Sequence, residues 1–119
     1  MSDSTSQTLK QLKIKTGVVK RLHKEESVYM QEVVDQKKVV EKLKADDAEG
    51  ADIRAAERVL RDSEMMVPRT RGQLEEAVQA LDDLVSALKA EESINTTTEY
   101  KDAADQLKTI EAAWEAYDG

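Results

Sequence analysis

A single proline stands inside the longest regular pattern of this sequence. Between residues 53 and 88, apolar side chains recur at alternating intervals of three and four residues, which is typical of a helix that packs a seam against other helices. Pro68 lacks an N–H and its ring clashes with the carbonyl of Glu64, so we expect a kink there. The seam keeps its phase on both sides, and both arms are therefore predicted to pack on the same neighbours. The seam comprises Ile53, Ala56, Leu60, Ser63, Val67, Thr70, Leu74, Ala77, Leu81, Leu84 and Leu88.

The composition favours long helices over strands. Charged residues make up 36% of the chain and aromatic residues 3%, and phenylalanine is absent. Strands are enriched in β-branched and aromatic residues, whereas long helices are rich in charged ones. At 119 residues the chain has the size of one domain. The predicted fold class is therefore all-α.

Several classes of protein are disfavoured by the same composition. The net charge of −7 argues against general nucleic-acid binding, and the lack of cysteine excludes disulfides and thiol chemistry. No apolar run approaches the ~20 residues of a membrane span. Residues 1–8 are polar and lack the apolar core of a secretory signal, so we expect a disordered tail. A cytoplasmic protein that binds neither nucleic acid nor membrane is the resulting expectation.

Two further helices are predicted on either side of the central one, which we place at about 52–89. The first runs over about 9–45, and residues 46–51 form a turn that reverses at Gly50, with Asp52 as the N-cap of the central helix. A turn this short makes the two helices antiparallel neighbours. The first seam comprises Leu12, Lys15, Val19, Leu22, Glu26, Tyr29, Val33, Gln36, Val40 and Leu43.

A third helix is predicted over about 98–117, after a connection at 89–98. Thr96 and Glu99 have the spacing of a capping box. Together the three helices predict an elongated, up-down-up antiparallel three-helix bundle over residues 9–119. The third seam comprises Tyr100, Ala103, Leu107, Ile110, Trp114 and Tyr117.

The third helix is too short to cover the whole length of the other two. At ~1.5 Å per residue, a helix of this length is about half as long as the first one. The other half, near 29–43 and 53–67, is then a two-helix hairpin with one side of its seam uncovered. An apolar groove there, including Met65 and Met66, is a candidate surface for a partner or a dimer. Long charged side chains that cover the groove are the alternative.

The start of the first helix carries cations only. No acidic residue occurs from Ser4 to Lys24, and cations in the first turns of a helix oppose its macrodipole. Gly17 costs roughly 1 kcal/mol relative to alanine in a helix. These unfavourable choices suggest another demand, such as an acidic partner, although pairing with acids such as Asp82, Asp83, Glu91 and Glu92 is the alternative. The cations are Lys10, Lys13, Lys15, Lys20, Arg21 and Lys24.

No motif for catalysis or metal binding is evident. The single histidine, His23, has no carboxylate or nucleophile at a spacing that fixes their geometry. The turn at 46–51 resembles part of a calcium loop, but aligning Gly50 with its central glycine places Ala45 and Ala56 where ligands are needed. Glycine motifs for phosphate or dinucleotide binding are absent from the sequence. We therefore expect no enzyme activity, no cofactor and no metal.

Three short segments resemble one known family, that of tubulin-binding cofactor A. Residues 13–22 (KIKTGVVKRL) are similar to the family's opening, and residues 63–68 (SEMMVP) resemble its Ser-x-Met-Met-Ile-Pro segment. Residues 99–103 (EYKDA) are similar to the start of its third helix. The segments occur in the family's order, although Val67 replaces isoleucine and residues 69–72 and 114–119 depart from the pattern.

The resemblance implies a chaperone for tubulin. Such a cofactor captures β-tubulin after its release from the cytosolic chaperonin and passes it on for assembly with α-tubulin, without ATP, metal or catalysis. It implies a three-helix bundle, a cytoplasmic and microtubule-associated location, contacts with other tubulin-folding cofactors, and a monomer rather than a dimer. The residues that we expect to bind β-tubulin are Lys13, Lys15, Lys20, Arg21, Lys24, Tyr29, Met65, Met66, Tyr100 and Lys101.

A second hypothesis comes from the heptads alone. A structural or tethering three-helix module, homodimeric through the uncovered hairpin, explains the same periodicity. It leaves the similarity of the three segments unexplained. Capture of β-tubulin and the oligomeric state distinguish the two hypotheses.

Overall fold

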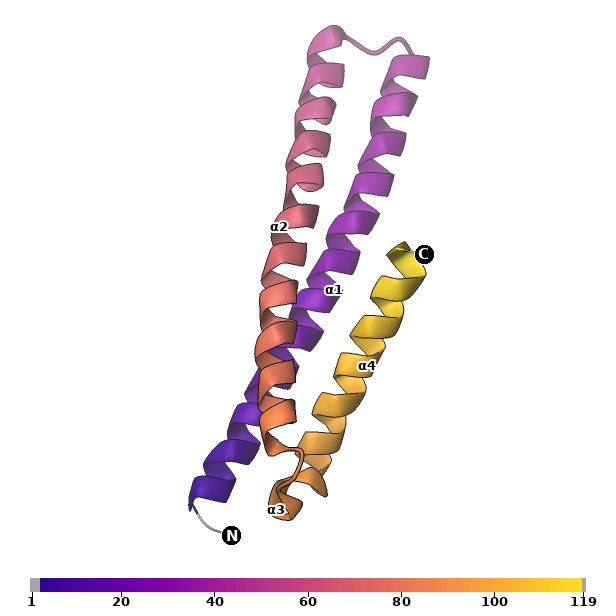
Figure 1. Ribbon diagram of the computed structural model, residues 1–119. Coiled ribbons are helices and arrows are strands. Elements are labelled where there is room, and N and C mark those ends of the chain that lie inside the picture. Colours follow the sequence, from indigo (N-terminus) through magenta and orange to yellow (C-terminus); the bar gives the residue numbers. More distant parts are fainter. Residues whose placement is uncertain (1–2, 119) are drawn as a thin grey trace. The chain divides into compact units, whose positions relative to one another are not determined.

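The chain forms four helices over the residues that the computed structural model describes, 3–118. They are α1 (Asp3–Ala45), α2 (Gly50–Leu88), α3 (Glu92–Asn95) and α4 (Thr98–Asp118), and no strand occurs within that range (Figure 1). The all-α prediction is confirmed. The prediction of three helices missed α3, because a single turn of helix is too short to carry a periodic pattern.

The first helix begins earlier than predicted. Residues 1 and 2 of the proposed tail lie outside the described part, but α1 starts at Asp3 instead of residue 9. Asp3 is in the first turn, where a negative charge favours the helix, and the hydroxyl of Thr8 donates to the carbonyl of Ser4 (3.0 Å). Leu9 and Leu12 are buried and hold the next turns. The prediction of disorder for residues 3–8 was therefore wrong as far as helix formation is concerned.

The turn between α1 and α2 reverses at a different residue from the one predicted. Asp47 adopts a positive φ of 55°, whereas Gly50 is already the first residue of α2. The N–H of Ala48 donates to the carbonyl of Leu43 (3.0 Å) and that of Asp47 to Lys44 (3.3 Å), which is the Schellman pattern. Aspartate tolerates the left-handed conformation better than most residues, so it takes the place of glycine here. The assignment of Asp52 as N-cap was also wrong.

The connection before α4 is stabilised by Thr97 instead of Thr96. The Thr97 hydroxyl accepts a hydrogen bond from the N–H of Tyr100 (3.2 Å) and donates to the carbonyl of Ile94 (2.6 Å). Thr96, which directly follows α3, donates to the carbonyl of Glu92, the first residue of that helix (3.0 Å). Adjacent threonines are equally good caps by sequence, and the placement of α3, which Ile94 anchors at 1% exposure, decides between them.

Pro68 lies inside α2, which continues as a single helix to Leu88. Both Pro68 and Glu64, whose carbonyl loses its helical partner, are exposed. Water therefore has access to that turn, which reduces the cost of the missing hydrogen bond. The predicted kink is a bend of the α2 axis at Pro68, and it remains a prediction.

The chain divides into two compact units, which we call the core unit and the hairpin unit. The core unit consists of Met1–His23 and Gln73–Gly119, and the hairpin unit of Lys24–Gly72. The core unit thus contains the start of α1, the end of α2, and α3 and α4. Its buried cluster comprises Leu9, Leu12, Val19, Leu22, Leu74, Leu81, Leu88, Ile94, Ala103, Leu107 and Ile110.

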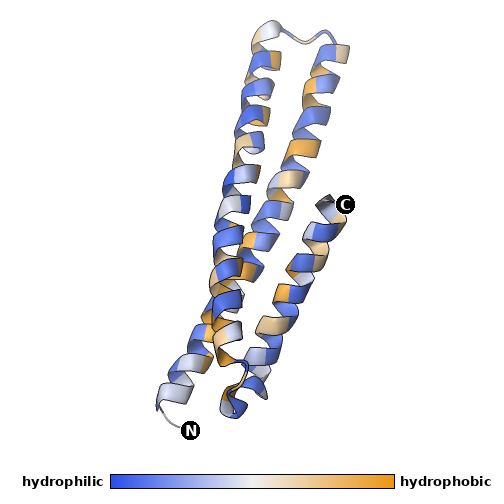
Figure 2. Cartoon of the chain, viewed as in Figure 1, coloured by the Kyte–Doolittle hydropathy of each residue, from blue (hydrophilic) through white to orange (hydrophobic). Residues whose placement is uncertain are grey.

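Nine of the eleven cluster residues lie at predicted seam positions, whereas Leu9 and Ile94 lie outside the seams, and the third seam departs from the structure at the end of α4. Trp114 packs against the cluster, but Tyr117 is 66% exposed and was wrongly placed in the seam. Its hydroxyl favours contact with water near the end of a helix. Apolar and polar residues alternate along the helices, as Figure 2 shows.

The hairpin unit has very little buried apolar surface. Of the apolar residues that are buried among residues 3–118, only Val40 and Ala56 belong to this unit. Large apolar side chains are exposed on it instead, at positions beside the predicted seam, so the uncovered seam itself stays a prediction. They are Val28, Val34, Val39, Val59 and Met65.

Candidate functional site

The cations of α1 in the core unit form an exposed basic face. Lys13, Lys20 and Arg21 are exposed, and Lys15 is half-buried. The Nζ of Lys20 donates to both carboxylate oxygens of Asp102 on α4, at 3.2 and 3.0 Å. Pairing of these cations with acids of the second and third long helices was predicted as the alternative to partner binding, and the Lys20–Asp102 pair agrees with it, although Asp102 was not among the acids named. Both groups of this pair are about half exposed, so their charges also remain accessible to a partner.

The beginning of α4 meets the basic face at a shallow groove of about 350 Å³. The groove is lined by Lys13, Thr98, Glu99 and Asp102. Three of them come from two segments that carry the family resemblance, 13–22 and 99–103, and Thr98 directly precedes the second. The groove brings two acids and a lysine together, so its lining carries a net negative charge and does not favour an anionic ligand.

Tyr100 serves the fold of the core unit instead of forming an exposed apolar contact. Its side chain packs against the buried cluster, and its hydroxyl points to the carbonyl of Val85 at 3.5 Å, a long hydrogen bond. The neighbouring Lys101 is exposed. Of the two predicted binding residues on α4, Lys101 is thus the more exposed, and Tyr100 is half-buried.

The hairpin unit presents the other predicted residues on one level of its two helices. Met65 is 69% exposed, Tyr29 and Met66 are half-buried, and Lys24 is exposed. The helices are antiparallel here, since Glu26 pairs with Arg71 and Gln36 bonds to the backbone of Ala56. In this register Tyr29 lies opposite residues near 68, about one turn from Met65 and Met66.

A buried ion pair in the hairpin unit was not predicted. Glu26 occupies a seam position, and its carboxylate accepts two hydrogen bonds from the guanidinium of Arg71, at 2.5 and 3.3 Å. The side chains are 6% and 24% exposed. Glu26 was visible as a polar seam residue, but Arg71 lies one position beyond seam residue Thr70, so no sequence signal paired them.

A second shallow groove, of about 160 Å³, lies between α1 and α2 of the core unit. It is lined by Ile14, Lys15, Val18, Ala77 and Ala80. Ile14 is 48% exposed. Counting the seam in steps of three and four passed over Ile14 and Val18, although their apolar character off the seam was a usable signal.

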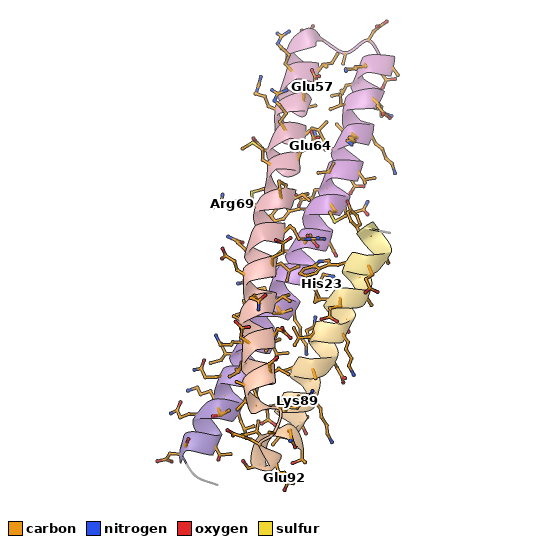
Figure 3. All side chains as sticks on the ribbon, in the orientation of Figure 1. His23, Glu57, Glu64, Arg69, Lys89 and Glu92 are labelled. Carbon is orange, nitrogen blue, oxygen red and sulfur yellow. The ribbon has the colours of Figure 1, made fainter. Side chains whose placement is uncertain are left out.

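The described residues offer no arrangement for metal binding. Among residues 3–118 no three His, Asp or Glu side chains lie together in a way that would hold a metal ion. His23 is half-buried on α1, whereas Glu57 and Glu64 lie two turns apart on α2 (Figure 3). Glu57 forms a loose ion pair with Lys44 of α1, at 3.8 Å. No helix in the described range is long and apolar enough to span a membrane.

Comparison with known proteins identifies the family. The model of the tubulin binding cofactor A family matches residues 7–107. This chain belongs to the tubulin binding cofactor A family. It is 39% identical over 102 residues to tubulin-specific chaperone A from Bos taurus and from Homo sapiens, which covers 86% of this chain and 92% of each relative. The resemblance predicted from the three short segments is therefore confirmed.

More distant members and solved structures agree with this assignment. Tubulin-specific chaperone A of Saccharomyces cerevisiae is 32% identical over 98 residues, which covers 82% of this chain and 92% of the yeast protein. The human tubulin chaperone cofactor a has a TM-score of 0.72 at 36% identity and covers 87% of this chain and 98% of its own. Tubulin folding cofactor A from Arabidopsis thaliana has a TM-score of 0.77 at 31% identity, over 90% and 98%. Members of the tubulin binding cofactor A family thus share the all-helical fold and carry names of tubulin chaperones.

Proposed function

We propose that this protein captures β-tubulin after its release from the cytosolic chaperonin, protects it from aggregation, and passes it on for assembly with α-tubulin. The observation that carries the proposal is the family match over residues 7–107, together with relatives named tubulin-specific chaperone A. The protein acts as a cytoplasmic monomer that associates with microtubule proteins and with other tubulin-folding cofactors. It needs no ATP, metal or catalytic group.

The basic face of α1 supplies the electrostatic part of this binding. Lys13, Lys20 and Arg21 belong to it in the core unit, with Lys101 on α4, and Lys24 continues the series on α1 of the hairpin unit. Lys15 lies about 160° from Lys13 around α1 and adds its charge at the groove with α2. A net negative protein that binds another acidic protein needs local complementarity, which an all-cationic stretch supplies. Charges of this kind raise the association rate and make it sensitive to salt.

The hairpin unit supplies the apolar part. Met65, Met66 and Tyr29 lie near one level of α1 and α2, and methionine adapts to surfaces of irregular shape. A folding intermediate exposes apolar surface that the chaperone has to cover. An accessible side chain such as Met65, at 69% exposure, is suited to that task. The burial of Tyr100 against the core gives that residue a supporting role in place of direct contact.

We also propose a bundle with up-down-up order, in which α3 is part of the connection and Pro68 kinks α2. The order of the three long helices and the short turn after α1 support the first part. The proline in the interior of α2 supports the second. A kink next to Met65 and Met66 changes the direction in which those side chains project. It therefore changes the apolar surface that α2 offers to β-tubulin.

The proposed function is tested by capture of β-tubulin made in a cell-free translation extract. Wild-type protein is expected to form a stable complex with it, which is seen on a native gel. Addition of α-tubulin with the other cofactors is expected to dissociate that complex. The double variant Lys20→Glu, Arg21→Glu is expected to weaken capture about tenfold at low salt, because reversed charges repel an acidic client.

A matched control separates charge from structure. Asp102→Asn breaks the same ion pair with Lys20 without reversing any cation of α1. It is expected to leave capture within twofold of wild type, since exposed pairs contribute at most about 1 kcal/mol to stability. Unchanged capture by the double variant would exclude the basic face, and no complex with wild type would exclude the function.

A further inference from the structure

The groove between α1 and α2 of the core unit has features of a docking surface for a helix. Its lining is mostly apolar, from Ile14 and Val18 on α1 and from Ala77 and Ala80 on α2. Its volume of about 160 Å³ lies below the ~300–1,000 Å³ of small-molecule sites. It therefore fits the side chains of a partner that lies along it better than a whole small ligand.

The groove borders the buried core, since Val18 and Ala77 pack against the core cluster, but its outer wall, Ile14, points away from the core. At about 100° per residue, Ile14 points about 160° away from Leu12 and from Thr16, which are 0% and 3% exposed. Packing of the core unit therefore does not need Ile14 to be apolar. An exposed isoleucine beside small residues has no function in the fold that we describe.

On the α2 side the groove is lined by short side chains. Ala77 is half-buried and Ala80 is exposed, and neither side chain extends beyond its first carbon. Short side chains allow the backbone of an approaching helix to come close, so that its larger residues interdigitate with Ile14 and Val18. Rows of larger side chains on two neighbouring helices, with short side chains between them, are a common packing site for another helix.

The two rims of the groove carry opposite charges. On α1, Lys10 and Arg21 lie four residues before and seven residues after Ile14 on the same face, and Lys15 lines the groove itself. On α2, Glu76 and Asp83 lie four residues before and three residues after Ala80, and both are exposed. Asp83 also accepts a hydrogen bond from Gln79 (2.8 Å), a neutral group that leaves its charge in place.

We infer that this groove receives an amphipathic helix of the client, with the acidic edge of that helix along α1 and its basic edge along α2. The inference rests on the proposed function, because the client is β-tubulin. It adds an apolar contact beside the basic face of α1, where the sequence had suggested Tyr100 instead. The opposite charges of the rims fix which edge of the helix faces α1 and thereby its direction.

The test uses full-length protein with two substitutions that act in different ways. Ile14→Asp places a charge among the apolar lining residues, and Ala80→Trp fills the groove. Both residues are exposed, so both variants are expected to unfold at the temperature of wild type, as followed by circular dichroism. Each is expected to raise the Kd for cell-free β-tubulin at least tenfold.

Tyr117→Asp is the matched control, because it also replaces an exposed apolar side chain of the core unit by an acid, on α4 and away from the groove. It is expected to leave the Kd within twofold of wild type. Wild-type capture together with unchanged capture by Ile14→Asp and Ala80→Trp would overturn this inference alone. Absence of capture by wild type would overturn both the inference and the proposed function.

A cross-linking experiment identifies what occupies the groove. The chain has no cysteine, so Ala80→Cys carries a unique thiol to which a short photo-crosslinker is attached before β-tubulin is added. Cross-links are expected to a single β-tubulin helix at residues spaced three or four apart, and not from the control Ala112→Cys on the exposed side of α4. Cross-links to a second copy of this chain would assign the groove to self-association and overturn the inference.

Discussion

The ion pair of Glu26 and Arg71 places a buried carboxylate at a seam position of the hairpin unit. Removing two charges from water is costly, and the two hydrogen bonds between them offset that cost only when both partners are present. A lone buried carboxylate is then much less favourable than an apolar side chain of similar size. The pair therefore restricts the register of α1 against α2 more than it stabilises the hairpin.

The first prediction concerns this pair. Arg71→Met is expected to lower the free energy of unfolding by about 3 kcal/mol, because it leaves Glu26 buried without its cation. The double variant Glu26→Leu, Arg71→Met is expected to recover all or most of that loss. Urea denaturation of wild type, Glu26→Leu, Arg71→Met and the double variant measures both changes in the free energy of unfolding. Arg69→Met, at an exposed arginine labelled in Figure 3, is the control and is expected to change stability by less than about 0.5 kcal/mol. A loss of less than 1 kcal/mol in Arg71→Met would contradict the proposed burial cost.

At the same scale, the sequence predicted which residues face the core better than what they contact. The seam count placed Leu12, Val19 and Leu22 correctly, because burial follows directly from helical periodicity. It did not predict the partner of Glu26, since pairing across helices depends on their offset, and a one-residue change in the turn at Asp47 changes that offset. The seam count also placed Tyr100, which packs against the buried cluster, whereas its contact with β-tubulin stays a prediction.

At the scale of the helices, glycines in α1 and α2 weaken elements that are otherwise continuous. Gly17 and Gly72 lie in helix interiors, and a Cβ built on either would have no neighbour within 4 Å. Neither glycine is therefore required by a close approach of other atoms. Their cost to the helix, roughly 0.5–1 kcal/mol each relative to alanine, is not offset by packing.

The second prediction follows from this. Gly17→Ala and Gly72→Ala are each expected to raise the free energy of unfolding by about 0.5–1 kcal/mol, and to add when combined, because neither added Cβ has a neighbour within 4 Å that the two could share. Thermal unfolding followed by circular dichroism measures the change. Gly50→Ala is the control, because Gly50 is the first residue of α2 and its added Cβ would lie 3.0 Å from the Arg54 guanidinium. Destabilisation by Gly17→Ala or Gly72→Ala would show that the helices need flexibility at those points.

The positions of the long helices followed from the sequence, whereas their ends did not. Periodicity extends over five heptads in α2 and averages out local errors, but a helix end depends on one or two hydrogen bonds. Asp47 and Thr97 took roles that had been assigned to Gly50 and Thr96, residues within three positions that have similar preferences. The short helix α3 was missed because Ile94 is held by tertiary packing and not by a pattern.

At the scale of the whole molecule, burial is divided unequally between the two units. The cluster of eleven buried apolar residues belongs entirely to the core unit, and only Val40 and Ala56 are buried apolar residues of the hairpin unit within the described range. Burial of a large apolar side chain contributes about 1.5–3 kcal/mol. Local stability is therefore expected to differ between the units, with the hairpin unit opening more readily. The proposed function needs such a surface, because side chains that cover an apolar client have to be exposed before binding.

The last prediction is that hydrogen exchange will show this division. Backbone amides at 28–42 and 53–67 of the hairpin unit are expected to exchange at least tenfold faster than amides at 74–88 and 103–110 of the core unit, because fewer buried contacts oppose their opening. Exchange followed by mass spectrometry on the free protein measures both sets, and the sets come from helices, so differences in secondary structure do not contribute. Repetition with bound β-tubulin is expected to slow exchange in the hairpin unit more than at 103–110, since binding covers Met65 and its neighbours. Equal protection of the two units in the free protein would mean that the hairpin is stabilised by contacts other than apolar burial, and its role as the adaptable apolar surface would have to be abandoned.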